Sequence, residues 1–196
     1  MTILNDGTAA LPVKYYSGDS NSARKLLENA FAPSKEMAPT SFNAWLINSG
    51  DKLILVDTGY STGIGPVAGH LPKAPAAAGV SPAEIDDVII THVHPDHCNG
   101  LLTTEQQIAY PNAVVHINGD EWEGDVKVPA GKPFFAELFE GGRKVFKPYI
   151  DAKKVQTFKD GAELAPGVVA VTATGHTVGH TMIRIANGNG QLLIVG

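Results

Sequence analysis

Ten residues in the middle of the chain limit most strongly what it can fold into. The segment Thr91–Gly100, THVHPDHCNG, directly follows the apolar run Val88–Ile90 and contains three of the seven histidines in the chain. A short apolar run rich in β-branched residues predicts a buried strand. The fold must therefore bury a strand whose end carries three imidazoles and a carboxylate.

The spacing within this segment indicates a metal site. Side chains two residues apart on an extended segment point to the same side, so His92 and His94 can reach one point. Asp96 and His97 follow Pro95, where the chain must turn, and can face a second point nearby. Imidazole nitrogens and carboxylate oxygens bind zinc and similar ions. A lone histidine is usually a surface or core residue, but four such groups within six positions favour metal binding.

A second histidine element lies later in the chain. Residues Thr174–His180, TGHTVGH, follow another apolar run, Val168–Thr172. The two glycines in this element allow the chain to turn tightly around a ligand. The two histidine elements are thus both predicted to follow strands.

The remaining pattern favours an α/β fold. Ser81–Glu84 has the sequence of a helix start, Pro133–Glu140 reads as a short amphipathic helix, and Ser61–Gly79 as a long loop. Strands outnumber helices and several adjoin as hairpins, which favours a mixed α/β sandwich over a doubly wound parallel sheet. The predicted strands are Phe42–Asn48, Lys52–Val56, Val88–Ile90, Ala113–Ile117, Val155–Phe158, Val168–Thr172, Thr181–Ala186 and Gln191–Val195.

Composition excludes several classes of protein. The 196 residues are 43% hydrophobic and carry a net charge of -5, which is ordinary for a globular protein and makes nucleic acid and anionic membrane poor candidates as partners. No apolar run approaches the roughly 20 residues of a membrane span. The N-terminus lacks the pattern of a signal peptide, so the sequence as it stands predicts a cytoplasmic protein. A truncated N-terminus would leave a periplasmic or secreted location open.

Together the motifs resemble those of the metallo-β-lactamase superfamily. The sequence has His-x-His-x-Asp-His at His92–His97 and Gly-His-Thr-x-Gly-His at Gly175–His180, after an upstream Asp-Thr-Gly at Asp57–Gly59. The resemblance runs from about Asn43 to Gly196 and implies an αββα sandwich of mixed sheets with flanking helices.

The resemblance also implies a ligand set and a reaction. His92, His94 and His176 would hold one metal ion, and Asp96 and His97 would be ligands of a second. Two divalent ions, with zinc expected first and manganese, iron or cobalt as alternatives, would activate a hydroxide that attacks an ester, lactone or phosphotriester. Asp96 would also move a proton. The supporting residues, which contact ligands and do not bind metal themselves, would be Asp57 and His180.

The sequence departs from the family pattern at its ends. The family has a bridging aspartate after an apolar strand, and here the strand Gln191–Val195 reaches Gly196, the last residue. The N-terminal Thr2–Gly7 resembles a strand and turn that family members have some way into the chain. We therefore expect residues 1–196 to be a single domain of which the C-terminal half of the sandwich is missing, with an incomplete second metal site and weak activity at best.

Within the superfamily, the stretches around Trp45, Asp57 and His97 look most like the branch of methyl parathion hydrolase and related lactonases. The expected substrate is a small molecule of the lactone, aryl ester or organophosphate class. A glyoxalase II-like thiolesterase and a metal-binding fragment without turnover are the alternatives. The sequence leaves the oligomeric state open.

Some residues between the two histidine elements have two interpretations. The aromatic residues there are candidates to line an apolar pocket or to pack in the core: Trp122, Phe134, Phe135, Phe139, Phe146 and Tyr149. Cys98 adjoins His97 and is interpreted as a small buried residue that starts a helix. His70 and His116 have no partner in sequence and are interpreted as structural.

Overall fold

The fold is described from a computed structural model of residues 1–196, in which residues 1–15, 19–61, 68–71, 78–123 and 140–196 are described. The larger sheet has six strands in the order β1-β2-β3-β4-β5-β6. These strands are β1 Thr2–Pro12, β2 Met37–Asn48, β3 Leu53–Val56, β4 Asp87–Ile90, β5 Val114–Asn118 and β6 Val155–Phe158. Pairing is antiparallel from β1 to β3 and parallel from β3 to β6.

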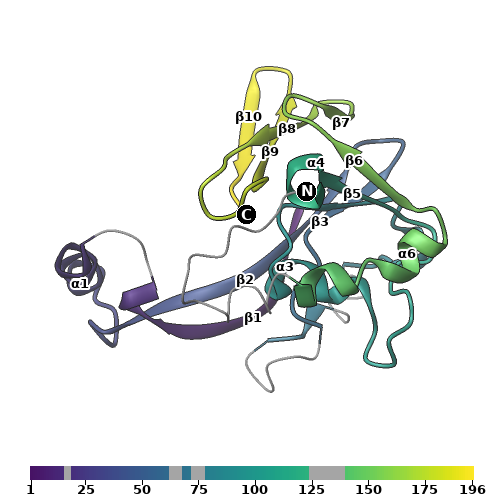
Figure 1. Ribbon diagram of the computed structural model, residues 1–196. Coiled ribbons are helices and arrows are strands. Elements are labelled where there is room, and N and C mark those ends of the chain that lie inside the picture. The colour runs from purple at the N-terminus through teal and green to yellow at the C-terminus, as the bar shows by residue number, and fades with distance from the viewer. Residues whose placement is uncertain (16–18, 62–67, 72–77, 124–139) are drawn as a thin grey trace.

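The smaller sheet has four antiparallel strands in the order β10-β9-β8-β7. They are β7 Glu163–Ala165, β8 Val168–Thr172, β9 Thr181–Asn187 and β10 Gly190–Ile194. Figure 1 shows this sheet, coloured green to yellow, lying against the larger one. The helices are α1 Ser20–Asn29, α3 Pro95–Cys98, α4 Gly119–Glu123 and α6 Lys147–Asp151, with 3-10 turns at Val13–Tyr15, Pro82–Glu84 and Asn99–Leu101.

The central strands are buried on both faces, and their side chains alternate between two apolar clusters. In β3, Leu55 packs with residues of α3 and α6, whereas Ile54 and Val56 pack with β8, β9 and β10. In β4, Ile89 likewise faces the smaller sheet. This alternation explains why these strands read as continuous apolar runs. It also produces helix, sheet and sheet layers among the described residues, as expected for a mixed α/β sandwich.

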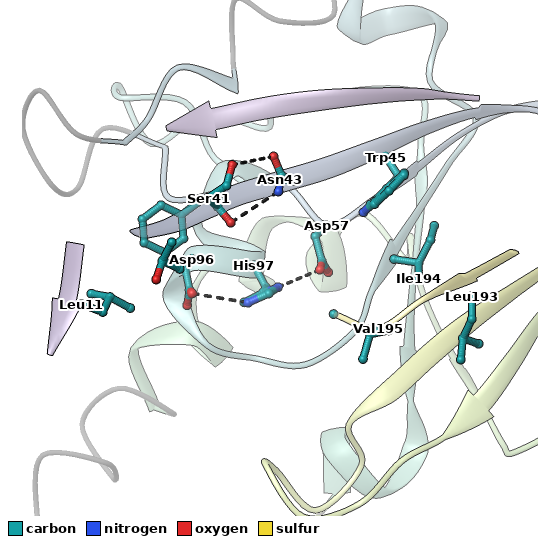
Figure 2. A pocket seen from close by; sticks show the side chains of 13 residues that line it. Leu11, Ser41, Asn43, Trp45, Asp57, Asp96, His97, Leu193, Ile194 and Val195 are labelled. Carbon is teal, nitrogen blue, oxygen red and sulfur yellow. Dashed lines mark hydrogen bonds and ion pairs between the residues drawn. The ribbon is translucent and has the colours of Figure 1, made fainter. Parts of the chain in front are cut away.

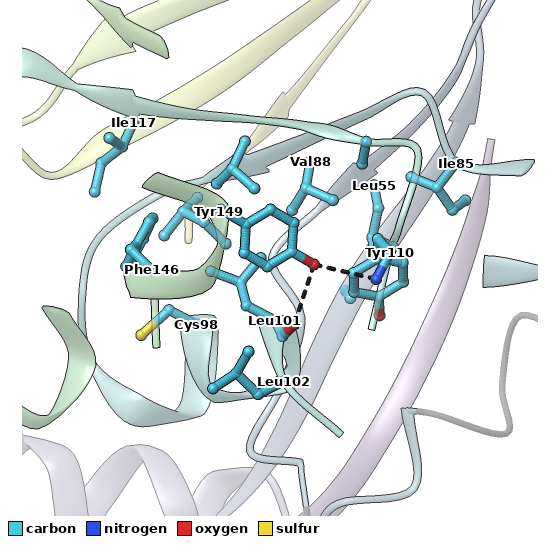
Figure 3. Packing of buried hydrophobic residues seen from close by; sticks show 14 of the residues in the cluster. Leu55, Ile85, Val88, Cys98, Leu101, Leu102, Tyr110, Ile117, Phe146 and Tyr149 are labelled. Atoms are coloured by element: carbon cyan, nitrogen blue, oxygen red, sulfur yellow. Dashed lines mark hydrogen bonds between the residues drawn. The ribbon is translucent and has the colours of Figure 1, made fainter. Parts of the chain in front are cut away.

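The hydroxyl of Tyr149 in α6 connects segments of the helical layer through two hydrogen bonds. This hydroxyl donates to the Leu101 carbonyl at 3.0 Å and accepts the Tyr110 amide N–H at 3.1 Å (Figure 3). Cys98 is also buried in this cluster, at the last residue of α3. The sequence interpretation of Cys98 as a buried residue is confirmed, but the helix begins at Pro95 and not at Cys98.

Several elements differ from the sequence prediction. The N-terminal strand and turn is instead a strand of 11 residues, β1, with a bulge between Asn5 and Gly7. The strands β1 and β2 project from the rest of the fold and lead to α1, which has no buried residue (Figure 1). Neither α1 nor β7 was predicted. The expected helix Pro133–Glu140 and most of the expected loop Ser61–Gly79 lie outside the described residues.

The parallel strands bring the predicted site residues to one edge of the sheet. Asp57 follows β3, Thr91 follows β4, and the turn into α4 follows β5. Because β3, β4 and β5 are parallel neighbours, their carboxyl ends lie at the same edge. Segments far apart in the sequence therefore meet there.

Among the described residues, the helices include none that is both long and apolar enough to span a bilayer.

Replacing Tyr149 with phenylalanine tests this description of the helical layer. The Tyr149→Phe change removes one hydroxyl and leaves the buried Leu101 carbonyl and Tyr110 amide without that partner, which should cost about 1–3 kcal/mol. Urea unfolding monitored by circular dichroism measures the difference. An unchanged free energy of unfolding would contradict the assignment.

Candidate metal centre

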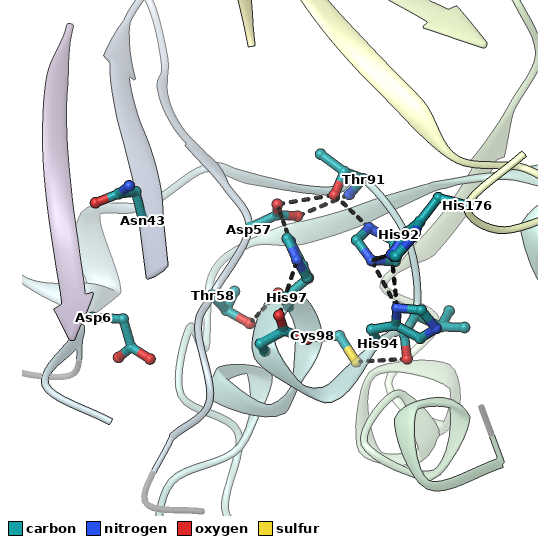
Figure 4. A network of polar contacts seen from close by, with 12 residues as sticks. Asp6, Asn43, Asp57, Thr58, Thr91, His92, His94, His97, Cys98 and His176 are labelled. Carbon is teal, nitrogen blue, oxygen red and sulfur yellow. Dashed lines mark hydrogen bonds and ion pairs between the residues drawn. The ribbon is translucent and has the colours of Figure 1, made fainter. Parts of the chain in front are cut away.

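Three imidazoles from the two histidine elements converge on one point (Figure 4). His92 Nε2 lies 3.1 Å from His94 Nδ1 and 3.1 Å from His176 Nε2, and His94 Nδ1 lies 3.0 Å from His176 Nε2. A tetrahedral zinc site with Zn–N bonds of about 2.0–2.1 Å separates its ligand nitrogens by about 3.3 Å. The three nitrogens are therefore spaced as ligands of one ion, and the triad can hold a metal.

The local fold accounts for this convergence. His92 and His94 flank Val93, whose side chain is fully buried, so the extended segment after β4 sends both imidazoles to the other side. His176 comes from the loop between β8 and β9, where Gly175 has a φ of 140°. His92 is buried, His94 is half-buried and His176 is exposed, so the triad opens to solvent on one side.

Asp57 fixes the orientation of the His92 ring through Thr91. The Asp57 carboxylate accepts the Thr91 amide and hydroxyl, each at 2.9 Å. Because the hydroxyl proton of Thr91 points to Asp57, Thr91 Oγ1 must accept from His92 Nδ1, at 3.1 Å. The hydrogen-bond network thus assigns the proton of His92 to Nδ1 and leaves Nε2 with a free electron pair directed at the triad.

The same carboxylate also holds His97. His97 Nδ1 donates to Asp57 Oδ2 at 2.7 Å, and its Nε2 lies 3.4 Å from Asp96 Oδ2 (Figure 2). The His97 ring centroid is 4.0 Å from that of His92. Asp96 and His97 therefore lie together beside the triad, and the Asp57 carboxylate contacts His97 directly and the triad through Thr91.

The triad is electrically neutral near pH 7. Burial, followed by the charge of His176, lowers the pKa of His94 to about 4. Burial also lowers the pKa of His92 well below its usual value, and neighbouring imidazoles add to the effect. The pKa of His176 falls for the same reasons, with burial first and His97 second. Neutral imidazole is the form that binds a metal ion.

His97 behaves in the opposite way. Burial disfavours its charged form, but the charge and hydrogen bond of Asp57 and those of Asp96 outweigh burial and raise the pKa of His97 to about 10. Burial raises the pKa of Asp96, but His97 outweighs it and lowers that pKa. Without metal, Asp96 and His97 therefore form an ion pair, and His97 would have to release a proton to become a ligand.

His180 lies beside the triad and not within it. Its ring centroid is 5.0 Å from that of His92 and 5.7 Å from that of His176. Gly196, with a φ of 87°, packs so closely on it that a Cβ at this glycine would lie 2.6 Å from His180 Nε2. His180 is thus not one of the three imidazoles whose nitrogens converge.

The other candidates have different surroundings. The Cys98 thiol, whose pKa burial raises well above its usual value, faces the carbonyls of Val93 and Gly142 at 3.5 and 3.8 Å. His116 Nε2 lies 2.7 Å from Asp87 Oδ1, and the His70 amide donates to Asp6. Cys98 and His116 therefore make structural contacts through their side chains, whereas His70 is exposed and its hydrogen bond comes from its backbone amide.

Glu121 is a site residue that sequence reasoning missed. Its side chain is fully buried, and its two carboxylate oxygens accept the amides of Val93 and Gly179, one from each histidine element. It belongs to no histidine motif, and a glutamate after a strand is too common to stand out. Its position following β5, a parallel neighbour of β4, was the signal available.

A pocket of about 400 Å³ adjoins Asp96 and His97 (Figure 2). Its polar part includes Ser41 and Asn43. Its apolar wall is formed by Leu11, Phe42, Trp45, Leu193, Ile194 and Val195. Among the aromatic residues proposed for a pocket, Trp122, Phe146 and Tyr149 pack with the core instead, and Phe134, Phe135 and Phe139 lie outside the described residues.

The lowered histidine pKa values predict how the stability of the metal-free protein depends on pH. Below the ordinary histidine pKa of 6.5, the unfolded chain binds protons at His92, His94 and His176. In the folded chain the pKa values of all three are lowered, that of His94 to about 4, so these imidazoles bind protons only at lower pH. Stability should therefore fall as the pH drops from 7 to 5. Urea midpoints of chelator-treated protein measure this fall, and the exposed His70→Ala variant should show the same slope. A midpoint that does not change with pH would contradict the lowered pKa values of the triad.

Comparison with known proteins shows the family to which the chain belongs. Residues 38–196 match the model of the metallo-β-lactamase superfamily. A hydrolase of the β-lactamase superfamily, AbOPH, matches with a TM-score of 0.89 and 27% identity over 99% of this chain and 69% of that one.

Two lactonases share the fold. AidC, a dizinc quorum-quenching lactonase solved with a product, has a TM-score of 0.84 and 24% identity, covering 97% of this chain and 68% of that one. A quorum-quenching N-acyl homoserine lactone lactonase has a TM-score of 0.62 and 19% identity, covering 97% and 70%. At these identities the similarity shows the fold alone. From the family match and the histidine triad, the chain belongs to the metallo-β-lactamase superfamily and is one of its metal-dependent hydrolases.

Proposed function

We propose that the protein is a zinc-dependent hydrolase of lactones and related esters that carry an apolar group. The convergence of the His92, His94 and His176 nitrogens within 3.0–3.1 Å of one another is the observation that carries this proposal. In this proposal the triad binds one zinc ion, and Asp96 and His97 contribute ligands to a second. We also propose that residues 1–196 belong to one domain, which the shared packing of β2, β3 and β4 with β8, β9 and β10 supports.

The reaction needs groups that a metal ion and the protein supply together. A bound divalent ion lowers the pKa of water from about 16 towards 7 and polarises a substrate oxygen. The protein residues orient the imidazole ligands and supply a proton to the leaving group. Asp57 holds the His97 ring directly and the His92 ring through Thr91. Asp96, whose carboxylate reaches the pocket, is the group that we propose accepts a proton and returns it to the leaving group.

The pocket supports an apolar substrate group. The wall formed by Trp45, Leu193 and Val195 stands beside Asp96 and His97, so a substrate held at the metal centre could place an acyl or aryl chain against it. The similar AidC is a lactonase, which favours a lactone with such a chain. Aryl esters and phosphotriesters offer the same combination of polar centre and apolar group and are the next candidates.

Metal analysis tests the triad directly. We expect one or two zinc ions per chain in purified wild-type protein and none at the triad in the His92→Ala/His176→Ala variant, because two of its three nitrogens are gone. Atomic emission spectrometry on dialysed protein measures this, with His70→Ala as a histidine variant remote from the triad. Equal zinc content in the double variant would contradict the proposed ligands.

A substrate panel tests the reaction. N-acyl lactones of increasing chain length, aryl esters, phosphotriesters and a glutathione thioester would be assayed with zinc-loaded protein. We expect lactone hydrolysis that improves with acyl chain length and that falls by about 10-fold or more in Trp45→Ala, because each buried methylene contributes about 0.8 kcal/mol. Hydrolysis of the thioester alone would assign the protein to the thiolesterases. Zinc binding with rates no higher than those of free zinc would leave a metal-binding protein without turnover.

A further inference from the structure

Glu121 joins the two histidine elements through a single buried carboxylate. Its Oε1 accepts the Val93 amide N–H at 3.0 Å, and its Oε2 accepts the Gly179 amide N–H at 2.8 Å. The side chain is 0% exposed. Both partners are donors, so the ionised carboxylate, which has two acceptor oxygens, satisfies both bonds.

The two amides belong to the segments that carry the triad. Val93 lies between His92 and His94, and Gly179 lies in the loop that contains His176. These amides are 28 and 58 residues away from Glu121 in sequence. This carboxylate is a direct side-chain link between the segments, next to the backbone bond from the Thr181 amide to the Thr91 carbonyl at 3.0 Å.

The backbone at Val93 is held at its carbonyl as well as at its amide. The Cys98 thiol lies 3.5 Å from the Val93 carbonyl oxygen, and a Cβ at Gly142 would come within 1.9 Å of that oxygen. Its amide faces Glu121 and its carbonyl faces Cys98 and Gly142. The two peptide groups that flank the Val93 Cα are thus both fixed in orientation.

Glu121 is itself held rigidly. Arg143 donates to its backbone carbonyl at 3.1 Å. Just before it, Asn118 Nδ2 donates to the hydroxyls of Thr172 and Thr181, each at 3.1 Å, at the ends of the strands that flank the loop of His176. A Cβ at Gly179 would lie 2.2 Å from the Glu121 backbone nitrogen, so the loop rests directly on α4.

We propose that Glu121 is a positioning residue for the metal centre, which sets the distance between His176 and the His92–His94 pair through the Val93 and Gly179 amides. The inference rests on the proposed binding of zinc by the triad. A residue that orients ligands without touching the metal typically changes metal affinity about 10- to 100-fold when it is replaced. Glutamine has the same shape as glutamate but offers one acceptor oxygen, so its amide group would face one of the two N–H donors.

The test compares zinc affinity in wild type, Glu121→Gln and Glu163→Gln by competition with a chromophoric chelator. Glu163 is a matched control because its carboxylate also accepts a backbone amide, that of Gly167 at 2.9 Å, in the exposed part of β7. We expect zinc affinity to fall about 10- to 100-fold in Glu121→Gln and to be unchanged in Glu163→Gln. The cobalt(II) form of Glu121→Gln should show an altered visible absorption spectrum, which a general loss of stability would not produce.

Two further measurements keep the test decisive. In metal-free protein, amide hydrogen exchange at Val93 or Gly179 should speed up in Glu121→Gln. If that variant does not fold, Gly179→Ala, which pushes the loop off α4 without changing the carboxylate, should weaken zinc binding in the same way. Zinc affinity equal to wild type in a folded Glu121→Gln or Gly179→Ala protein would overturn the role of Glu121 and would leave the proposed function standing. Failure of the wild-type chain to bind zinc would overturn the proposed function and this inference together.

Discussion

The organisation of the candidate metal centre depends on the buried carboxylate of Asp57. It accepts hydrogen bonds from Thr91 and from His97 and so connects the end of β3 to the end of β4 and to α3. Through Thr91 it also determines which nitrogen of His92 carries the proton. Because a metal ion needs an imidazole nitrogen with a free electron pair, the direction of that proton decides whether the ring can be a ligand at all. Asp57 itself has a φ of 60°, in the left-handed region that residues other than glycine adopt infrequently.

Two electrostatic environments lie side by side in this centre. Burial keeps the imidazoles of the triad neutral, whereas the carboxylates of Asp57 and Asp96 keep His97 charged when no metal is present. The triad is therefore ready to bind an ion near pH 7, and the Asp96–His97 pair must first lose a proton. On this account the two proposed positions should fill in order, with the triad first. The apolar pocket lies beside the second of them, next to Asp96 and His97.

The strands and the triad could be predicted because the patterns that indicate them lie within short stretches of the sequence. Runs such as Val88–Ile90 are buried on both faces, so their apolar character alone identifies them, and the spacing of His92 and His94 follows from the geometry of an extended chain. By contrast, α1 has no buried residue, and β7 has three residues and a register shift, so neither has a strong pattern. Glu121 was missed because its partners are backbone amides, which leave no trace in the sequence, and only its place after a predicted strand pointed to it. For the aromatic residues between the histidine elements the sequence left pocket lining and core packing open. Trp122, Phe146 and Tyr149 pack with the core, and β2 and the end of β10 line the pocket.

The most direct test of the account is X-ray absorption spectroscopy of the zinc-loaded wild-type protein. The account predicts a shell of nitrogen or oxygen ligands at about 2.0–2.1 Å together with the outer scattering of imidazole rings from the triad. The imidazole contribution should diminish in His176→Ala, which removes one of the three converging nitrogens. A ligand shell without imidazole scattering in the wild type would mean that zinc binds elsewhere, and it would contradict the proposal that the convergence of His92, His94 and His176 forms the metal centre.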